Sequence, residues 1–148
     1  MALQQFCTFY LDRLFFGVNV LNVQEAIRNQ EMTRIPLAPD VLRGLINLRG
    51  QIVTALDLRE RLCLPPKEAN DDFMNVIINS SDAAVSLLVD EVGEVIEVDE
   101  SDFEPPPHHL DNELKALVDG VYKLDQQLML VLNTDKTVDL EIQIIAQI

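Results

Sequence analysis

The residue types that usually build a metal or catalytic centre are scarce in this chain. His108 and His109 are its only histidines, and because they are adjacent, an extended backbone would point their side chains to opposite faces. A zinc site needs three or four converging ligands, and the two cysteines, Cys7 and Cys63, lie far from the histidines in sequence. We therefore expect no bound metal and no other cofactor.

Carboxylates are the abundant reactive groups, and one short acidic run gathers several of them. Asp99, Glu100, Asp102 and Glu104 precede three prolines at 105–107, but the run lacks the glycine and the distal glutamate of an EF-hand calcium loop. Like charges in such a run usually face water. We expect a solvated acidic loop here.

No motif of an established enzyme class occurs in the sequence. Glycine-rich phosphate loops, the zinc protease motif HExxH and the serine hydrolase motif GxSxG are all absent. We therefore expect a protein that is not an enzyme. A carboxylate pair acting as in glycosidases stays open, although a chain with no Trp and 2 Tyr offers little aromatic surface for a sugar.

The most distinctive segment is GLINLRGQIV, which begins at Gly44. It predicts two apolar strands, Gly44–Leu48 and Gln51–Leu56, joined by a tight turn in which Gly50 takes a positive φ. The turn would hold Arg49, with its five hydrogen-bond donors, at the tip of a hairpin. From residue types alone, an ordinary exposed arginine is the simpler interpretation.

The rest of the chain is typical of short strands separated by turns. Three further hairpins are expected, which are Phe6–Leu11 with Leu14–Val20, Val76–Ile78 with Ala84–Val89, and Leu117–Leu124 with Leu128–Leu132. Residues 92–98 predict another strand with a bulge at Gly93, and Val23–Arg28 can be extended or helical. This pattern predicts an all-β protein made of one or two small barrels.

A few short helices are expected between these strands. Asp57 is a suitable N-cap for a helix over Leu58–Leu62, and Asp40 for a single helical turn. Thr134 is the expected cap of a final helix with apolar residues at 138, 142 and 145, although alternation at 140, 142 and 144 leaves a strand open.

Composition and charge narrow the function classes further. The 148 residues carry a net charge of −14 and are 48% hydrophobic, which suits one domain with a substantial core. All seven arginines lie in residues 1–65, whereas residues 66–148 hold 19 of the 25 acids. A phosphate backbone repels this charge, so nucleic acid is not an expected partner. The longest uncharged stretch, Leu14–Gln24, is too short to cross a bilayer and no export signal is recognisable, so we expect a cytoplasmic protein.

The hairpin segment, read together with Asp57-Leu58-Arg59, resembles the signature of the chemotaxis coupling-protein (CheW-like) family. The signature residues are Asn47, Leu48, Arg49, Gly50, Asp57 and Arg59. The similarity extends in family order over roughly residues 5–137. Its other parts include Val23-Gln24-Glu25, Thr33-Arg34-Ile35-Pro36, Leu88–Val92, Phe103 with the three prolines, and Leu128–Asn133.

The resemblance implies both a fold and a function. The fold would be two intertwined five-stranded SH3-like barrels, with short helices and possibly a C-terminal helix, in a single CheW-like domain over 1–148. The first barrel would span roughly 13–66 and the second roughly 72–125, with terminal segments crossing over. The protein would be a non-catalytic adaptor that joins a CheA-type histidine kinase to the cytoplasmic tips of methyl-accepting chemoreceptors, recruited to membrane-associated arrays without inserting into the membrane.

The resemblance also assigns residues to the two partners. The receptor-binding groove between the barrels would be lined by Val20, Val23, Glu25, Arg49 and Val95, with Glu25 and Arg49 facing each other. Kinase-binding residues would be Arg43 and Gly44 on the first barrel, with a second contact at Glu104, His108 and His109. The alternative is a small-molecule or carbohydrate-binding β-barrel protein, possibly a carboxylate-based hydrolase. A deep pocket with converging carboxylates would favour this alternative, and a shallow apolar groove the adaptor.

Overall fold

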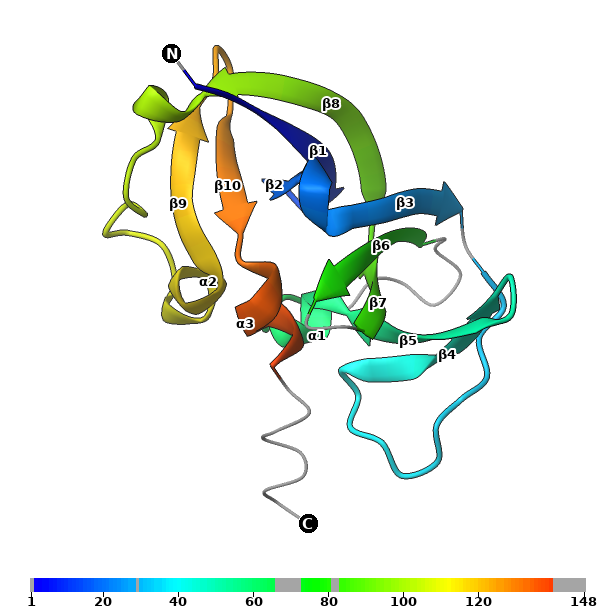
Figure 1. The fold of residues 1–148 in the computed structure, drawn as a ribbon. Helices are drawn as coiled ribbons and strands as arrows, with labels where there is room; N and C mark the ends of the chain where they lie inside the picture. Colours follow the sequence, from blue (N-terminus) through cyan, green and yellow to red (C-terminus); the bar gives the residue numbers. More distant parts are fainter. Residues whose placement is uncertain (1, 29, 66–72, 81–82, 140–148) are drawn as a thin grey trace.

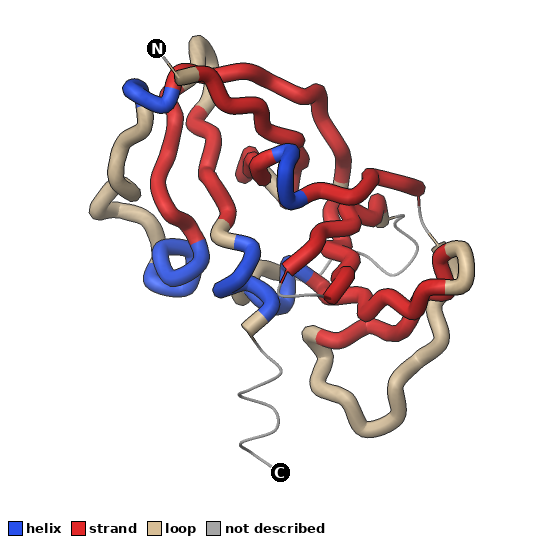
Figure 2. Tube along the Cα trace, in the orientation of Figure 1, coloured by secondary structure: helices blue, strands red, loops and turns tan. Residues whose placement is uncertain are grey.

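The computed structural model describes residues 2–28, 30–65, 73–80 and 83–139, and these form two curved β-sheets with short helices at their junction (Figure 1). Strands dominate the described chain (Figure 2). The predicted all-β class with two five-stranded units is therefore confirmed.

Sheet A has the strand order β8-β1-β2-β10-β9 and draws its strands from both ends of the chain. The strands are β1 (Leu3–Leu11), β2 (Leu14–Asn19), β8 (Glu91–Asp99), β9 (Val118–Lys123) and β10 (Leu128–Leu132). Sheet B has the order β3-β6-β7-β5-β4 and lies between these ends in sequence. Its strands are β3 (Val23–Arg28), β4 (Leu42–Leu48), β5 (Gln51–Asp57), β6 (Met74–Ser80) and β7 (Ala83–Val89).

Sheet B is built from consecutive strands, β3 to β7, and sheet A from the strands that precede and follow them in sequence. The chain passes from sheet A to sheet B after β2, and it returns to sheet A at Asp90, between β7 and β8. The hairpins β1–β2 and β6–β7 each pair with strands distant in sequence. The terminal segments do lie together in one sheet, because β1 and β2 pair with β8 and β10.

The two sheets repeat one arrangement. Each contains one parallel pair, β2 with β10 and β7 with β5, and each is completed by a backbone bridge beyond its edge strand. Thr33, after β3, pairs with Leu45 of β4, and Glu104, after β8, pairs with Val121 of β9. These bridges bring the two edges of each curved sheet together, as closure of a small barrel requires.

Glycine permits both of these closures. A Cβ at Gly44 would lie 2.7 Å from the Thr33 carbonyl oxygen, and one at Gly120 would lie 2.5 Å from the Glu104 carbonyl oxygen. Both distances are shorter than a real Cβ contact, so any side chain would push the bridging strand away. Gly44 and Gly120 are equivalent positions in the two sheets.

The core has three parts, and the largest joins the sheets. It packs Phe9 and Phe16 of sheet A against Ile78 and Leu87 of sheet B, all four fully buried. A smaller cluster around Ile46 and its neighbours lies within sheet B, and another with Tyr122 and Met129 lies within sheet A. The sheets therefore share one interior while each keeps its own.

The short helices only partly follow the sequence prediction. The α1 helix (Leu58–Arg61) begins at the predicted cap, Asp57, whose side chain accepts hydrogen bonds from the backbone of Arg59 and Glu60. The final helix, α3 (Thr134–Val138), is capped by Asn133 rather than Thr134, and its continuation at 142 and 145 lies outside the described residues. The remaining helices are α2 (Asn112–Leu117) and two 3₁₀ turns, η1 (Val20–Asn22) and η2 (Glu100–Asp102).

Three local predictions are resolved by the strand assignments. Val23–Arg28 is a strand, and Asp40 begins no helix but lies in a turn before β4. The α2 helix was not predicted. The pairing of β1 with β8 shifts register opposite Gly93, which confirms the bulge there.

Candidate functional site

Arg49 and Glu25 face each other, as expected, and form a two-point ion pair. Arg49 Nη1 lies 2.5 Å from Glu25 Oε2, and Nη2 lies 3.0 Å from Oε1. The hydrogen bond that the Arg49 guanidinium donates to Glu25, followed by the charge of that carboxylate, raises the pKa of the guanidinium. The Arg49 side chain is nevertheless 72% exposed, so its outer face is available to a partner.

The backbone of the turn fixes this arginine in place. Arg49 and Gly50 both have positive φ, 55° and 85°, as a two-residue hairpin turn requires. The Asn47 side chain accepts a 3.0 Å hydrogen bond from the Gly50 backbone N–H and closes the turn. Three of the signature residues thus shape one rigid tip at the end of β4 and β5.

The ion pair spans the two edges of sheet B. Glu25 belongs to β3 and Arg49 follows β4, which are the outermost strands of that sheet. Figure 1 shows the end of β3 and the β4–β5 turn on the same side of the molecule. The contact therefore links the ends of the curved sheet as well as presenting a charge.

The other expected receptor-binding residues lie on different elements. Val20 is in η1 and Val23 begins β3, where it packs against the shared core. Val95 lies on β8 of sheet A, beside Cys7, and is 56% exposed. Glu25 and Arg49 are joined by hydrogen bonds, whereas the side chains of these three valines can offer only apolar contacts.

Two exposed apolar side chains near these residues were not predicted. Leu21 in η1 is 87% exposed, and Ile52, paired with Asn47 beside the turn, is 61% exposed. Leu21 lies between two predicted groove residues, and Ile52 alternates with the buried Val53, so strand periodicity could have identified Ile52. With Val95, they add exposed apolar surface to the elements that carry the predicted groove.

The expected kinase-binding residues divide between the sheets. Arg43 of β4 forms a 3.0 Å ion pair with Asp57 and lies 5.3 Å from the centre of the Phe73 ring. Gly44 is buried at the closure with Thr33, where it supports the strand rather than offering a side chain. Glu104 forms the corresponding bridge in sheet A and pairs with Lys123 at 3.2 Å, and His108 and His109 are exposed in the following loop.

The last two signature residues have internal partners. Asp57 caps α1 and binds Arg43, and its side chain is only 6% exposed. Arg59 is buried beside Asp90, whose hydrogen bonds raise the pKa of its guanidinium despite the opposing effect of desolvation. These two residues therefore organise the end of β5 where α1 begins, which is the end opposite the Arg49 turn.

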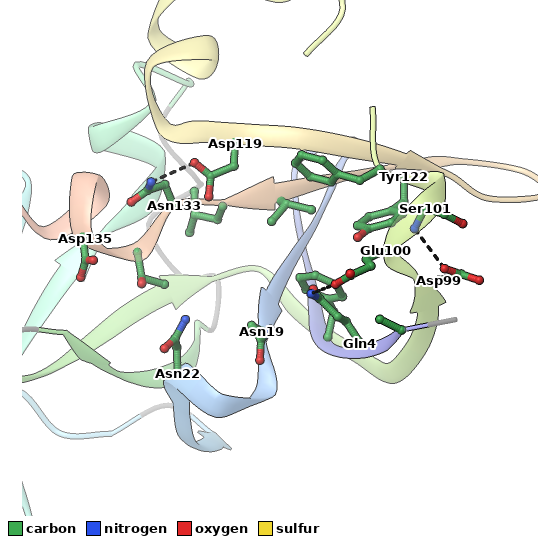
Figure 3. A pocket seen from close by; sticks show the side chains of 16 residues that line it. Gln4, Asn19, Asn22, Asp99, Glu100, Ser101, Asp119, Tyr122, Asn133 and Asp135 are labelled. Carbon is green, nitrogen blue, oxygen red and sulfur yellow. Dashed lines mark hydrogen bonds between the residues drawn. The ribbon is translucent and has the colours of Figure 1, made fainter. Parts of the chain in front are cut away.

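An open cleft with a volume of about 910 Å³ lies mainly on sheet A (Figure 3). Its acidic residues each have a hydrogen-bonding neighbour: Asp119 accepts from Asn133, Glu100 from Gln4, Asp99 from the Ser101 backbone, and Asp135 from Ser80. This cleft is open, and each of these carboxylates accepts a hydrogen bond from a neighbouring residue. The cleft gives no support to the hydrolase alternative.

The chain is similar to known proteins in both sequence and fold. The family model described as a CheW-like domain matches residues 5–141. The chemotaxis protein CheW of Bacillus subtilis (strain 168) is 31% identical over 126 residues, which cover 85% of this chain and 81% of that protein. The chemotaxis protein CheW of Treponema pallidum (strain Nichols) is 28% identical over 136 residues, covering 89% of this chain and 80% of that protein.

A solved structure is similar over nearly the whole chain. The scaffolding protein TtCheW from Thermoanaerobacter tengcongensis aligns with a TM-score of 0.83 at 28% identity, over 93% of this chain and 94% of that one. Within the ranges described above, no helix is long and apolar enough to cross a membrane.

Proposed function

The chain belongs to the CheW-like domain family, and from this membership we propose that it is a signalling adaptor coupling a CheA-type histidine kinase to the cytoplasmic tips of methyl-accepting chemoreceptors. The observation that supports this most strongly is the match of sequence and fold to chemotaxis and scaffolding proteins over nearly the full chain. The proposed adaptor acts by binding, without catalysis or a cofactor, in the cytoplasm beside receptor arrays.

The proposed receptor surface combines a fixed charge with exposed apolar groups. A receptor tip is a helical hairpin, and amphipathic helices bind where apolar side chains insert beside a charged rim. Arg49 supplies the charge, held by Glu25. Val95 supplies an exposed apolar group, and Val20 and Val23 supply half-buried ones. An arginine held in this way loses little conformational freedom on binding.

The proposed kinase surface uses the two equivalent closures. Arg43 beside Gly44 lies at the closure of sheet B, and Glu104 with the two histidines lies at that of sheet A. Two similar edges on one molecule suit a protein that must contact a partner on more than one side.

Reconstitution from purified components tests the proposal. The protein is mixed with a cytoplasmic receptor fragment and the CheA-type kinase from the same cell, and complex formation is followed by cosedimentation together with kinase autophosphorylation. We expect a ternary complex in which the kinase requires this protein to respond to the receptor. Failure to bind either partner, by a chain shown to be folded, would contradict the proposed function.

A further inference from the structure

One buried ion pair links the two sheets at the point where the chain crosses between them. Arg59, in α1 after β5 of sheet B, donates from Nε to Asp90 Oδ1 at 3.0 Å and from Nη2 to Oδ2 at 2.5 Å. Its remaining nitrogen, Nη1, donates to the Pro65 carbonyl at 2.7 Å. The Arg59 side chain is only 9% exposed, so each guanidinium nitrogen is held within the protein.

Asp90 connects this arginine to sheet A. It is the single residue between β7 and β8, and its backbone N–H donates to the Tyr10 carbonyl of β1 at 3.0 Å. Its Oδ2 also accepts the Asp12 backbone N–H at 2.7 Å, in the β1–β2 turn. One carboxylate thus joins a helix of sheet B, the crossover and a turn of sheet A.

The residue equivalent to Arg59 in the other sheet makes fewer polar contacts. The α3 helix follows β10 as α1 follows β5, and Asp135 is its second residue, as Arg59 is in α1. Asp135 accepts a single 2.5 Å hydrogen bond from Ser80, at the end of β6, and Asp135 itself is exposed. The α3 helix is also tied to α1, because Arg61 donates to the Thr137 carbonyl at 3.1 Å and to the Lys136 carbonyl at 3.0 Å. Asp135 itself therefore makes a single contact, whereas Arg59 uses all three of its guanidinium nitrogens.

The angle between the sheets matters for the proposed receptor surface, because its residues are divided. Val95 lies on β8, a few residues after Asp90, whereas Glu25 and Arg49 belong to sheet B. Their separation depends on how β8 leaves the crossover. We propose that Arg59 and Asp90 are positioning residues that fix the angle between the sheets, and through it the spacing of the receptor-binding groups.

The role in receptor binding rests on the proposed function, whereas the role in fixing the angle between the sheets does not. The geometry is measured first, in a Cys7→Ser, Cys63→Ser background with spin labels at Glu97→Cys on β8 and Gln51→Cys on β5. Pulsed electron resonance then gives the distance distribution between the sheets. We expect Arg59→Lys, which loses the two-point contact, and Asp90→Asn, which loses the charge, both to broaden or shift this distribution.

Ser80→Ala is the matched control, because it removes the hydrogen bond to Asp135, the residue of α3 equivalent to Arg59, and leaves the Arg59–Asp90 pair intact. Ser80→Ala should leave the distribution of distances between the two spin labels as narrow as in the protein without this substitution. Unchanged distributions in both Arg59→Lys and Asp90→Asn would overturn the inference, and either variant decides the question if the other does not fold.

Binding of the receptor fragment is measured on the same variants without labels, below their melting temperatures. We expect Arg59→Lys and Asp90→Asn to bind at least ten-fold more weakly, and Ser80→Ala to bind normally. Altered distances with normal binding would overturn the positioning role in binding. If the unmodified protein does not bind the fragment, the proposed function fails while the distance measurement still decides the geometry.

Discussion

Arg49 combines a fixed position with an exposed charge. The positive φ of Arg49 and Gly50 sets the turn, Asn47 closes it, and Glu25 holds the guanidinium by two contacts. Surface ion pairs contribute little to folding, because water screens them and ordering two long side chains costs entropy. This arrangement is better suited to orienting a binding partner than to stabilising the fold.

We predict that Arg49→Ala separates binding from stability. Its melting temperature should stay close to that of the unmodified protein, because the ion pair is mostly exposed. Binding of the receptor fragment should weaken by about 10-fold or more, because the partner loses a directed cation. Calorimetry and a binding titration on the same sample measure both effects.

Arg13→Ala is the matched control for this prediction. Arg13 is also an exposed arginine at a hairpin turn, between β1 and β2. Arg13→Ala should leave both the melting temperature and the affinity for the receptor fragment unchanged. An Arg49→Ala protein that melts several degrees earlier and still binds normally would show that Arg49 is structural.

Tyr122 should ionise late in an alkaline titration. It is 3% exposed and packs against Phe6 and Phe103, and burial, with a smaller effect of Glu100 and other nearby acids, raises the pKa of its hydroxyl. The difference in absorbance near 295 nm between the unmodified protein and Tyr122→Phe isolates its titration. Phenolate should form above the ordinary value of about 10.

The same shift has a defined effect on stability. A folded-state pKa above the unfolded value means that the folded protein holds the proton more tightly, so the stabilisation is complete below pH about 10 and is lost as pH rises through the folded pKa. Urea unfolding above pH 10 should therefore lose stability more steeply in the unmodified protein than in Tyr122→Phe. Equal slopes would contradict this assignment.

At the scale of elements, each sheet has one parallel-paired strand, β5 in sheet B and β10 in sheet A, that is followed directly by a capped helical turn. Asp57 caps α1 and its backbone N–H donates to the Val41 carbonyl, while Asn133 caps α3 and donates likewise to the Leu117 carbonyl. The two caps differ in charge and in their side-chain partners. The Asp57 carboxylate accepts a hydrogen bond from Arg43, whereas the neutral Asn133 amide donates one to Asp119.

We predict that Asp57→Ala lowers the free energy of unfolding by about 2 kcal/mol, since it removes a cap and leaves buried N–H groups unsatisfied. Asp57→Asn, which can still cap, should cost about half as much. Asn133→Ala should cost about 1 kcal/mol, the usual value for a cap. Urea denaturation measures all three, and equal losses for Asp57→Ala and Asp57→Asn would show that the Arg43 contact carries the effect.

Elements with a local signal were predictable from the sequence, and those set by distant contacts were not. The Arg49-Gly50 turn and the Asp57 cap depend on neighbouring residues, and both are confirmed. The α2 helix has only two buried apolar residues, Leu114 and Leu117, which is too short a pattern to distinguish from a loop. The pairing of strands across the crossovers leaves no local trace in the sequence, because it depends on residues far apart in the chain.

The candidate site shows the same limit. Glu25 and Arg49 are 24 positions apart, and only the family resemblance suggested that they meet. Arg59 and Asp90 are 31 positions apart and lie in segments that no single turn or hairpin connects. Their contact follows from the packing of the two sheets, which periodicity in one strand does not reveal.

At the scale of the whole molecule, the shared core makes the two sheets depend on each other. Phe16 of sheet A and Leu87 of sheet B are fully buried in one cluster, so neither sheet can separate without exposing apolar surface. Small domains built around one core usually unfold in a single step. We expect the same of this protein despite its two sheets.

The prediction is that probes on the two sheets report one transition. Tyrosine fluorescence follows sheet A, which carries Tyr10 and Tyr122, and a fluorophore on exposed Cys63, in a Cys7→Ser background, follows the end of α1 on sheet B. Phe16→Ala should lower the free energy of unfolding by about 4 kcal/mol and move both curves equally. Two separate transitions would contradict a shared core.

The interleaved strand order has a consequence for the protein during its synthesis. A ribosome releases the chain from its amino terminus, so all strands of sheet B, which end at Val89, are available before β9 and β10 exist. Until then β2 lacks the strand that pairs with its outer edge. Its aromatic residues Phe15 and Phe16, which are buried in the complete fold, are then incompletely covered. An unpaired apolar edge invites association with other nascent chains. β10 covers that edge once it has left the ribosome tunnel, and its pairing with β2 ends the period of greatest risk.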